Sequence, residues 1–274
     1  MLPVAVVIPI YKEDLTPYEL ISLQQCYSVL GNYPILFVCP KRMKIGKFHQ
    51  SQKSKGQFVF LDDVNFNTIT TYNHMLLSVW FYELFINYKY ILIYQLDCFV
   101  FTDKLMAWVD KGYSYIGAPW VRKDLNIDNN IEFMGVGNGG FSLRNVNDCI
   151  TVLNSSKKII NLKDCIKRHD SLQKPFKTLR GIKLHYKIDT FNKTYKNTTI
   201  NEDKVFELAA ARFNFFIIPK PEEALSFSFE EQPKKLYEMN NNELPFGCHA
   251  WWKYDLQFYK LIFKQYEHIV NEEL

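Results

Sequence analysis

The chain has 274 residues, of which 47% are hydrophobic and 23% are charged. This is enough apolar material to bury a sizeable core in one large domain or two small ones, and it excludes a disordered tail and a disulfide-rich miniprotein. The 33 basic and 29 acidic residues leave a net charge of +4. Such a balance is too weak for a dedicated nucleic-acid-binding protein and predicts only a mild attraction to anionic ligands.

The first 120 residues alternate short β-rich segments with longer helical patterns. Strands are predicted at residues 4–10, 35–39, 58–61 and 90–94, and helices at residues 17–30 and 68–86. This alternation predicts an α/β fold with a mostly parallel central sheet flanked by helices. In such sheets ligands bind at the carboxyl ends of the strands, where Cys39, Asp62 and Asp97 are expected to lie.

After Trp120 the pattern changes to glycine-rich, loop and mixed segments. Helical stretches are predicted around residues 146–169 and 201–212, a polar loop at about 189–200, a strand at 213–218, and a C-terminal helical stretch at 251–270. We expect a single domain over residues 1–274 with a nucleotide-type lobe (1–120) and a smaller acceptor-type lobe (121–274). The C-terminal stretch, with its aromatic residues and lysines, either packs on the domain, which we favour, or rests on a membrane surface.

The sequence gives no sign of export or of a membrane span. Six cysteines stand far apart without a CxxC pair, which predicts reduced thiols in a cytosolic protein and no structural zinc site. The apolar residues 2–10 contain Pro3 and Pro9 and follow no basic segment, so they favour a strand over a signal peptide. No stretch reaches the roughly 18 consecutive apolar residues of a membrane span. We therefore expect a cytoplasmic location.

An aspartate ends the most apolar predicted strand. Residues 90–94 lead into Gln95, Leu96 and Asp97, and another apolar segment follows. A carboxylate in such surroundings is costly unless it is exposed or paired with a cation or with hydrogen-bond donors. Asp97 either caps a turn or helix or binds a divalent cation that holds a diphosphate; we favour the cation, because the next predicted helix begins only near residue 102.

Three other segments carry candidate residues, each with a structural alternative. The glycine-rich residues 135–140 permit a close approach of the backbone to a ligand, or form a tight turn into a strand. Glu202 and Asp203 begin a predicted helix, where the helix dipole favours acidic residues whether or not they catalyse a reaction. His249 precedes two tryptophans, which suits a metal beside a sugar ring, although a single histidine is more often structural.

Taken in order, eight segments resemble a family of bacterial glycosyltransferase-like proteins described only as a domain of unknown function. They are residues 6–11, 72–76, 94–101, 115–120, 137–144, 201–203, 227–230 and 244–251. The resemblance extends over nearly the whole chain. It implies a GT-A fold, in which a nucleotide-sugar-binding α/β lobe is joined to an acceptor lobe.

The resemblance implies a metal ion. Glycosyltransferases with the GT-A fold usually hold Mn²⁺ or Mg²⁺ through an Asp-x-Asp motif, and the matching stretch here is Gln95, Leu96 and Asp97. Glutamine therefore replaces one aspartate. His249 matches a metal-ligating histidine late in many members of the fold, and Mn²⁺ accepts both oxygen and imidazole ligands. The implied metal ligands are Asp97 and His249.

The resemblance also implies a catalytic base. Residues 138–144 followed by Glu202 and Asp203 look like the arrangement in inverting galactosyltransferases, where an acidic residue of a Glu-Asp pair deprotonates the acceptor hydroxyl. A sugar hydroxyl is a poor nucleophile until a positioned carboxylate takes its proton. We predict Asp203 as the base, with Glu202 as the alternative and as a contact to the acceptor.

The remaining candidates are assigned by their positions in the fold, and turn or capping roles stay open for them. For the nucleotide-sugar donor they are Pro9, Tyr11, Glu13, Cys39, Asp62, Tyr72, Asn73, Gln95 and Asp97, and for the donor or acceptor sugar they are Asn138, Gly139, Gly140, Arg144, Trp251 and Trp252.

The predicted function is an inverting sugar transfer from a nucleoside diphosphate sugar to a glycan or lipid-linked glycan. We expect a UDP-sugar as the donor and the synthesis of a bacterial surface polysaccharide as the process, either in the cytoplasm or peripherally at the inner face of the membrane. A catalytically silent nucleotide-sugar or glycan-binding module is the alternative from another functional class, and a retaining transferase is the alternative among enzymes.

Overall fold

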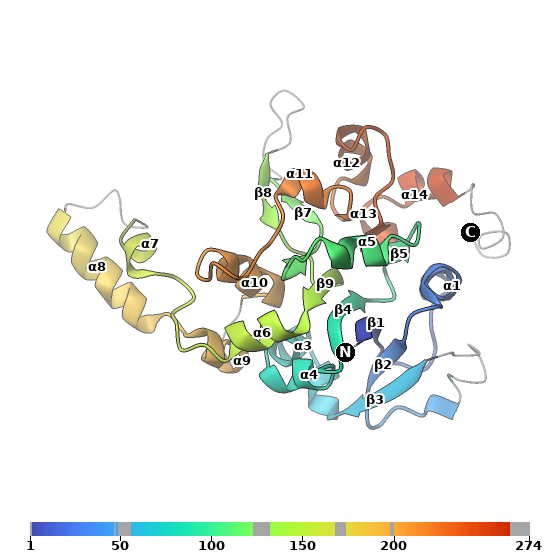
Figure 1. Cartoon of the computed structure of the whole chain (residues 1–274), viewed down its shortest axis with the longest axis horizontal. Coiled ribbons are helices and arrows are strands. Elements are labelled where there is room, and N and C mark those ends of the chain that lie inside the picture. Colours follow the sequence, from blue (N-terminus) through green and yellow to red (C-terminus); the bar gives the residue numbers. More distant parts are fainter. Residues whose placement is uncertain are drawn as a thin grey trace.

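The structure is a computed structural model that describes residues 2–46, 48, 56–122, 132–167, 174–197 and 200–263. Its described residues form a central six-stranded sheet (Figure 1) in the order β3 (Gln57–Leu61), β2 (Ile35–Pro40), β1 (Leu2–Pro9), β4 (Tyr88–Tyr94), β9 (Phe141–Asn145) and β6 (Tyr115–Ile116). Strands β1 to β4 run parallel, whereas β9 is antiparallel to both β4 and β6. The predicted α/β fold with a mostly parallel central sheet is confirmed.

Helices cover both faces of this sheet. Successive side chains of β1 point to opposite faces, so Val4, Val6 and Ile8 pack against α1 (Pro17–Leu30) and α5 (Leu105–Asp110). Ala5 and Val7 pack on the other face against α3 (Ile69–Leu76), α4 (Val79–Glu83), α6 (Val146–Leu153) and α10 (Glu202–Ala210). Burial on both faces explains why the strands appear in the sequence as continuous apolar runs.

Local capping sets the helix boundaries. Helix α1 begins after Thr16, whose side chain accepts a hydrogen bond from the backbone of Glu19 while the Glu19 carboxylate accepts one from the Thr16 backbone. The predicted helix over residues 68–86 is instead two short helices. It breaks at Ser78, whose hydroxyl donates to the Met75 carbonyl and so competes with the helical hydrogen bonds.

The second half of the chain is interleaved with the first. Strand β9 lies inside the central sheet, and β5 (Phe99–Val100) joins β10 (Ser228–Phe229) and β11 (Gly247–Cys248) in a small sheet. Strands β7 (Pro119–Val121) and β8 (Phe133–Val136) form a two-stranded sheet. The predicted lobe boundary at residue 120 therefore does not separate the sheets. The remaining helices are η1 (Asp63–Phe66), α7 (Leu162–Lys167), α8 (Lys174–Lys187), η2 (Phe191–Lys193), α9 (Thr194–Asn197), α11 (Pro221–Ala224), α12 (Pro233–Met239), α13 (Trp251–Tyr254) and α14 (Leu256–Phe263).

Three elements differ from the prediction. Residues 213–218 form a turn and irregular backbone instead of a strand, because Phe213 and Phe216 are both buried in the core and the backbone of this segment bonds to Ser114 and Tyr115 without forming a strand ladder. Helix α8 was not predicted, and the predicted loop at 189–200 contains η2 and α9. The C-terminal stretch is two helices that meet at Asp255, and its residues 264–270 lie outside the described part of the chain.

The six cysteines are all buried and unpaired. Within the described ranges, no helix combines the length and the apolar character that crossing a membrane requires.

Candidate active site

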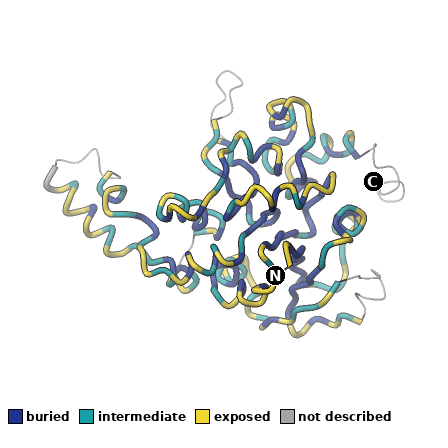
Figure 2. Tube along the Cα trace, viewed as in Figure 1, coloured by how far each residue is buried: buried dark blue, intermediate teal, exposed yellow. Residues whose placement is uncertain are grey.

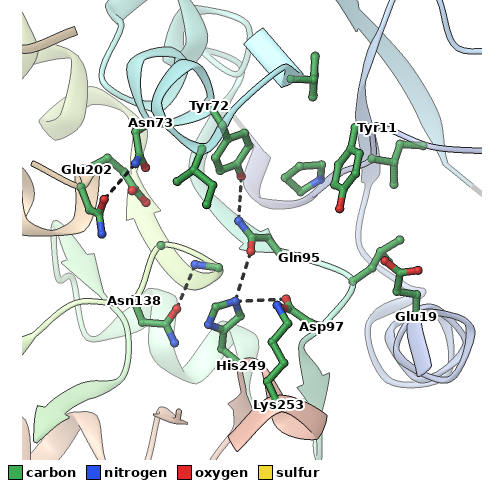
Figure 3. A pocket seen from close by; sticks show the side chains of 18 of the residues that line it. Tyr11, Glu19, Tyr72, Asn73, Gln95, Asp97, Asn138, Glu202, His249 and Lys253 are labelled. Carbon is green, nitrogen blue, oxygen red and sulfur yellow. Dashed lines mark hydrogen bonds and ion pairs between the residues drawn. The ribbon is translucent and has the colours of Figure 1, made fainter. Parts of the chain in front are cut away.

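A cleft of about 740 Å³ opens at the carboxyl ends of β1 and β4 (Figure 3). Parallel strands end at the same edge of a sheet, which is where ligands bind in α/β folds. The cleft wall is formed by residues 9–12 at the end of β1, 66–69, 72 and 73 around α3, 95–97 after β4, 138–140 before β9, 201–203 at the start of α10, and by Leu15, Glu19, Glu230, His249, Trp252 and Lys253. Asp97 and Asp203 thus lie in one cleft, although 105 residues separate them in the sequence.

His249 is held between two carboxylates. Its Nδ1 lies 2.9 Å from Glu230 Oε1, and its Nε2 lies 3.2 Å from Asp97 Oδ1. The other oxygen of Asp97 accepts a 2.6 Å hydrogen bond from Lys253 Nζ. Figure 3 shows the contacts of His249 with Gln95 and Asp97, with Lys253 alongside. Two cations of the chain therefore face a single aspartate on the floor of the cleft.

These contacts set the charges in the cleft. Burial disfavours both charged forms, but the mutual attraction outweighs it: His249 and Lys253 hold the pKa of Asp97 well below its usual range. Burial likewise acts to lower the pKa of His249, yet Asp97 and Glu230 raise that pKa to about 10. Without a bound metal, the histidine is therefore an imidazolium at neutral pH.

The same atoms fit a divalent cation. Asp97 Oδ1 is buried and faces the imidazole of His249, and candidate ligand atoms of Asp97, Cys98 and His249 lie within 4.8 Å of one another. His249 Nε2 lies 3.2 Å from Asp97 Oδ1 and 3.3 Å from Gln95 Oε1. Neighbouring ligands around an ion with bonds of about 2.1 Å stand about 3 Å apart, so these three atoms suit one ion. Glu230 then orients the imidazole through its contact with Nδ1, the ring nitrogen that does not face the ion, as carboxylates do at metal sites.

Cys98 does not belong to this ligand set. Its thiol is fully buried and donates to the Gly140 carbonyl, and burial raises its pKa well above the ordinary value. Metals bind the thiolate, which this environment disfavours.

Asp203 lines the same cleft, at the start of α10. Its Oδ2 accepts a 3.0 Å hydrogen bond from the Asn138 backbone, and its Oδ1 accepts one from the Lys204 backbone. Burial, followed by the nearby charge of Glu202, raises the pKa of Asp203 to about 6. A carboxylate with this pKa is ionised at neutral pH and is a better proton acceptor than an exposed aspartate.

Glu202 has a different environment from its neighbour. It forms a 2.9 Å ion pair with Arg144, and both side chains are almost completely buried. Arg144 also donates to the Gly139 carbonyl and to the Tyr82 hydroxyl. The prediction that Arg144 contacts a sugar is therefore wrong, because its side chain has no exposed surface. The pair instead ties the start of α10 to the glycine-rich segment.

The glycines before β9 make room for side chains of the site. A Cβ atom on Gly139 would lie 1.8 Å from Glu202 Oε1, and one on Gly140 would lie 2.1 Å from His249 Nε2. Asn138, which directly precedes these two glycines, adopts a left-handed backbone conformation (φ 74°). Its buried Nδ2 has no hydrogen-bond partner among the described residues. The segment therefore packs against catalytic candidates and presents one unpaired donor at the cleft.

The structure brings most of the predicted site residues together and places others elsewhere. Those that line the cleft are Pro9, Tyr11, Tyr72, Asn73, Gln95, Asp97, Asn138, Gly139, Gly140, Glu202, Asp203, His249 and Trp252. Glu13 and Asp62 lie outside it, where Glu13 accepts from the Lys44 backbone and Asp62 pairs with Lys41.

Two predicted contacts are excluded by burial. Cys39 is fully buried in the core and is not available to a nucleotide. Trp251 is fully buried as well: its indole donates to Ser22 and packs against Tyr18 and Phe263, so the predicted stacking on a sugar is wrong for this residue.

A second cavity of about 690 Å³ lies next to the cleft. Asn201, Asp203 and Glu230 line both spaces. The second cavity also has an apolar wall that includes Pro119, Trp120 and Met134, and the Met134 side chain is half exposed. Asp203 thus stands where the two spaces meet.

Sequence reasoning missed three functional candidates. Lys253 follows a tryptophan pair and carries no motif of its own, and Glu230 lies in a matched segment but had no assigned role. Both are recognised only from their contacts with His249 and Asp97. Trp120 ends another matched segment, and only the fold shows that it faces a cavity shared with Asp203.

A family model described as a protein of unknown function (DUF5672) matches residues 55–249. No curated protein matches the sequence.

Solved structures resemble the chain at low sequence identity. Mouse xyloside xylosyltransferase 1 in its apo form has a TM-score of 0.50 and 11% identity over 90% of this chain and 97% of its own. Glycosyltransferase GlyE of Streptococcus pneumoniae has a TM-score of 0.48 and 11% identity over 99% of this chain, which spans 63% of the GlyE chain. Galactosyltransferase LgtC, in complex with donor and acceptor sugar analogs, has a TM-score of 0.46 and 10% identity over 89% of this chain and 86% of its own. The likeness to the xylosyltransferase shows that the fold is of the GT-A type.

Proposed function

We propose that this chain, which belongs to the DUF5672 family, transfers a glycosyl group from a nucleoside diphosphate sugar to a hydroxyl group of a glycan acceptor. The observation that carries the proposal is the position of Asp203, a half-buried carboxylate between two adjoining cavities. One cavity then holds the donor and the other the acceptor. The GT-A fold and the glycosyltransferases among the structural neighbours support this assignment.

The donor occupies the cleft that contains Asp97. Lys253 supplies positive charge beside the diphosphate, and the unpaired Nδ2 of Asn138 donates to a donor oxygen. Asp97, His249 and Gln95 would hold Mn²⁺ or Mg²⁺, which stabilises the negative charge of the departing nucleoside diphosphate. UDP is the proposed nucleotide.

Asp203 is the proposed general base. As the acceptor oxygen forms its bond to the anomeric carbon, the hydroxyl proton passes to Asp203 and the bond from that carbon to the diphosphate breaks. Attack from the side opposite the leaving group inverts the anomeric configuration, which NMR of the product would show. Glu202 is not the proposed base, because its carboxylate already forms a buried ion pair with Arg144.

The acceptor occupies the second cavity. Its wall combines apolar surface on Trp120 and Met134 with polar groups of Asn201 and Glu230, a mixture that suits the apolar face and the hydroxyl groups of a sugar. The wider proposal is a glycan or lipid-linked glycan of a bacterial surface polysaccharide.

A donor screen tests the function. The protein is incubated with a panel of nucleoside diphosphate sugars and Mn²⁺, without and with methyl glycosides as acceptors, and the released nucleoside diphosphate is measured. We expect release with at least one donor and faster release with a matching glycoside. The incomplete Asp-x-Asp motif favours a silent binding module as the second candidate; calorimetric binding of a donor without release under any condition would support the module instead.

Metal binding is predicted to depend on Asp97 and, less strongly, on Glu230. Titration of Mn²⁺ followed by electron paramagnetic resonance should show one tight site in the unmodified chain and none in Asp97→Ala. Glu230→Gln should lower the affinity by about 10–100-fold, because the imidazole loses the carboxylate that orients it. Asp62→Asn, a carboxylate outside the cleft, is the control. Equal Mn²⁺ affinity in the unmodified protein and in all three variants would show that the metal does not bind at this site.

Filling the second cavity is predicted to block the acceptor alone. Met134→Trp should raise the acceptor KM at least about tenfold, a loss of about 1.4 kcal/mol of binding, while hydrolysis of the donor by water continues. Met239→Trp is the matched control, because this half-exposed methionine lies in α12 outside both cavities. An unchanged KM in Met134→Trp would place the acceptor elsewhere, and a parallel loss of donor hydrolysis would show damage to the donor cleft.

A further inference from the structure

Helix α8 differs in charge from the rest of the molecule. Its 14 residues include five lysines and arginines and no aspartate or glutamate, although the whole chain has a net charge of only +4. Arg180, Lys183 and Lys187 are exposed, and no ion pair engages them within the described part of the chain. These three residues form a positive strip that no described residue neutralises by an ion pair.

The same helix exposes an apolar strip. Phe176, Leu179, Ile182 and Tyr186 are exposed, with 63% of Leu179 and 81% of Tyr186 accessible to solvent. Their spacing of three, three and four residues places them on one side of the helix, next to Arg180 and Lys183. Exposed apolar residues scattered singly are ordinary, but a continuous row along one helix marks a contact surface.

The opposite side of α8 is anchored. Gly181 lies against α7, where a Cβ atom would come within 2.5 Å of Ile166. Figure 1 shows the α7 and α8 pair extending away from the central sheet, and Figure 2 shows α8 as largely exposed beyond the body of the domain. The helix is therefore held in place on one side and presents its basic and apolar strips on the other.

The occupant of this surface must satisfy both strips. A nucleic acid would neutralise the cations but leave Phe176 and Leu179 against water, and an uncharged protein surface would leave the cations without partners. A bilayer with anionic lipids satisfies both, because its headgroups pair with lysine and arginine while the acyl boundary receives the apolar side chains.

From this arrangement we propose that α8 docks the protein on the surface of a membrane that contains anionic lipids. The helix lies in the plane of the interface, with the apolar strip of Phe176, Leu179, Ile182 and Tyr186 inserted and Arg180, Lys183 and Lys187 at headgroup level. This proposal does not depend on the proposed enzymatic function.

The C-terminal helices are not the docking element. Tyr259 and Phe263 of α14 are fully buried against Trp251, so this helix packs on the domain, as the sequence analysis favoured over a membrane role. Lys260 and the exposed Leu261 make α14 a matched control for α8.

Vesicle flotation tests the proposal with the full chain. Phosphatidylcholine vesicles with about 30% phosphatidylglycerol should carry the unmodified protein, and pure phosphatidylcholine vesicles should carry much less. Arg180→Gln with Lys183→Gln should lower the partition coefficient about 30-fold, from about 1 kcal/mol for each charge lost near the surface. Phe176→Ser with Leu179→Ser should also reduce flotation at least about tenfold. Lys260→Gln with Leu261→Ser should float like the unmodified protein.

Several outcomes would overturn the proposal. Flotation that is unaffected by either α8 variant, or lost in the α14 control, would move the contact away from α8. An α8-dependent dimer in analytical ultracentrifugation, without flotation, would make the partner a second copy of the chain. Binding of a DNA duplex that is stronger than vesicle binding and insensitive to Phe176→Ser with Leu179→Ser would make it a nucleic acid. Because the altered α8 side chains and Leu261 are exposed and Lys260 is partly exposed, circular dichroism should show unchanged folding in each variant.

Discussion

Asp203→Asn is expected to lower kcat by about 10²–10⁴-fold while leaving the affinity for the donor nearly unchanged. The amide keeps the size of the side chain and can still accept the hydrogen bond from the Asn138 backbone. It cannot accept a proton, however, so the acceptor hydroxyl remains a poor nucleophile. Steady-state kinetics gives kcat, and calorimetry with the donor gives the binding constant.

The dependence of the transfer rate on pH should also report the ionisation of Asp203. The pKa of Asp203 is raised to about 6, and the base works only when it is deprotonated. Transfer should therefore be independent of pH above about 6 and fall about tenfold for each pH unit below it. An ordinary aspartate would place this limb near pH 4.

A second aspartate controls for the loss of charge at the start of a helix. Asp164 stands in the first turn of α7, outside both cavities, so Asp164→Asn removes the same kind of charge without touching the site. Its turnover and pH profile should match those of the unmodified enzyme. Full activity in Asp203→Asn would exclude this residue as the base.

Arg144→Met is expected to lower the free energy of unfolding by about 3–5 kcal/mol. The substitution leaves Glu202 as a buried charge without its partner and removes hydrogen bonds to the Gly139 carbonyl and the Tyr82 hydroxyl. Urea denaturation followed by circular dichroism measures the loss.

Two companion variants show whether the buried charge is the cause. Adding Glu202→Gln to Arg144→Met removes the unpaired charge, so the double variant should be more stable than Arg144→Met alone. Arg122→Met breaks the exposed pair with Glu132, whose side chains are 46% and 50% accessible, and should cost no more than about 1 kcal/mol. A small loss in Arg144→Met would show that the pair does not hold α10 in place.

The parallel half of the fold could be predicted because its strands are apolar on both faces. Residues of β1 and β4 appear as continuous hydrophobic runs between helical patterns, which is a strong local signal. The break at Ser78 depends on one hydroxyl that bonds a carbonyl, and the irregular backbone at 213–218 depends on the burial of two phenylalanines. Neither feature changes the hydrophobic pattern of the sequence, so neither could be predicted from that pattern.

The site was predictable in part for similar reasons. Asp97 follows a strand and Asp203 begins a helix, so their places in the sheet and in the matched segments predicted a shared cleft. Trp251 and Arg144 look like ligand contacts in the sequence, because nothing local shows that they are buried. Lys253 and Glu230 act through contacts across the fold, and such long-range contacts leave no periodicity in a single sequence.

Soaking crystals of the protein with Mn²⁺ and UDP tests the central claim, that donor and acceptor meet at Asp203. The account predicts a diphosphate in the cleft beside Asp97, His249 and Lys253, with its terminal phosphate on the side that faces Asp203 and the second cavity. A nucleotide bound at another surface, with the Asp97 cleft empty, would contradict it.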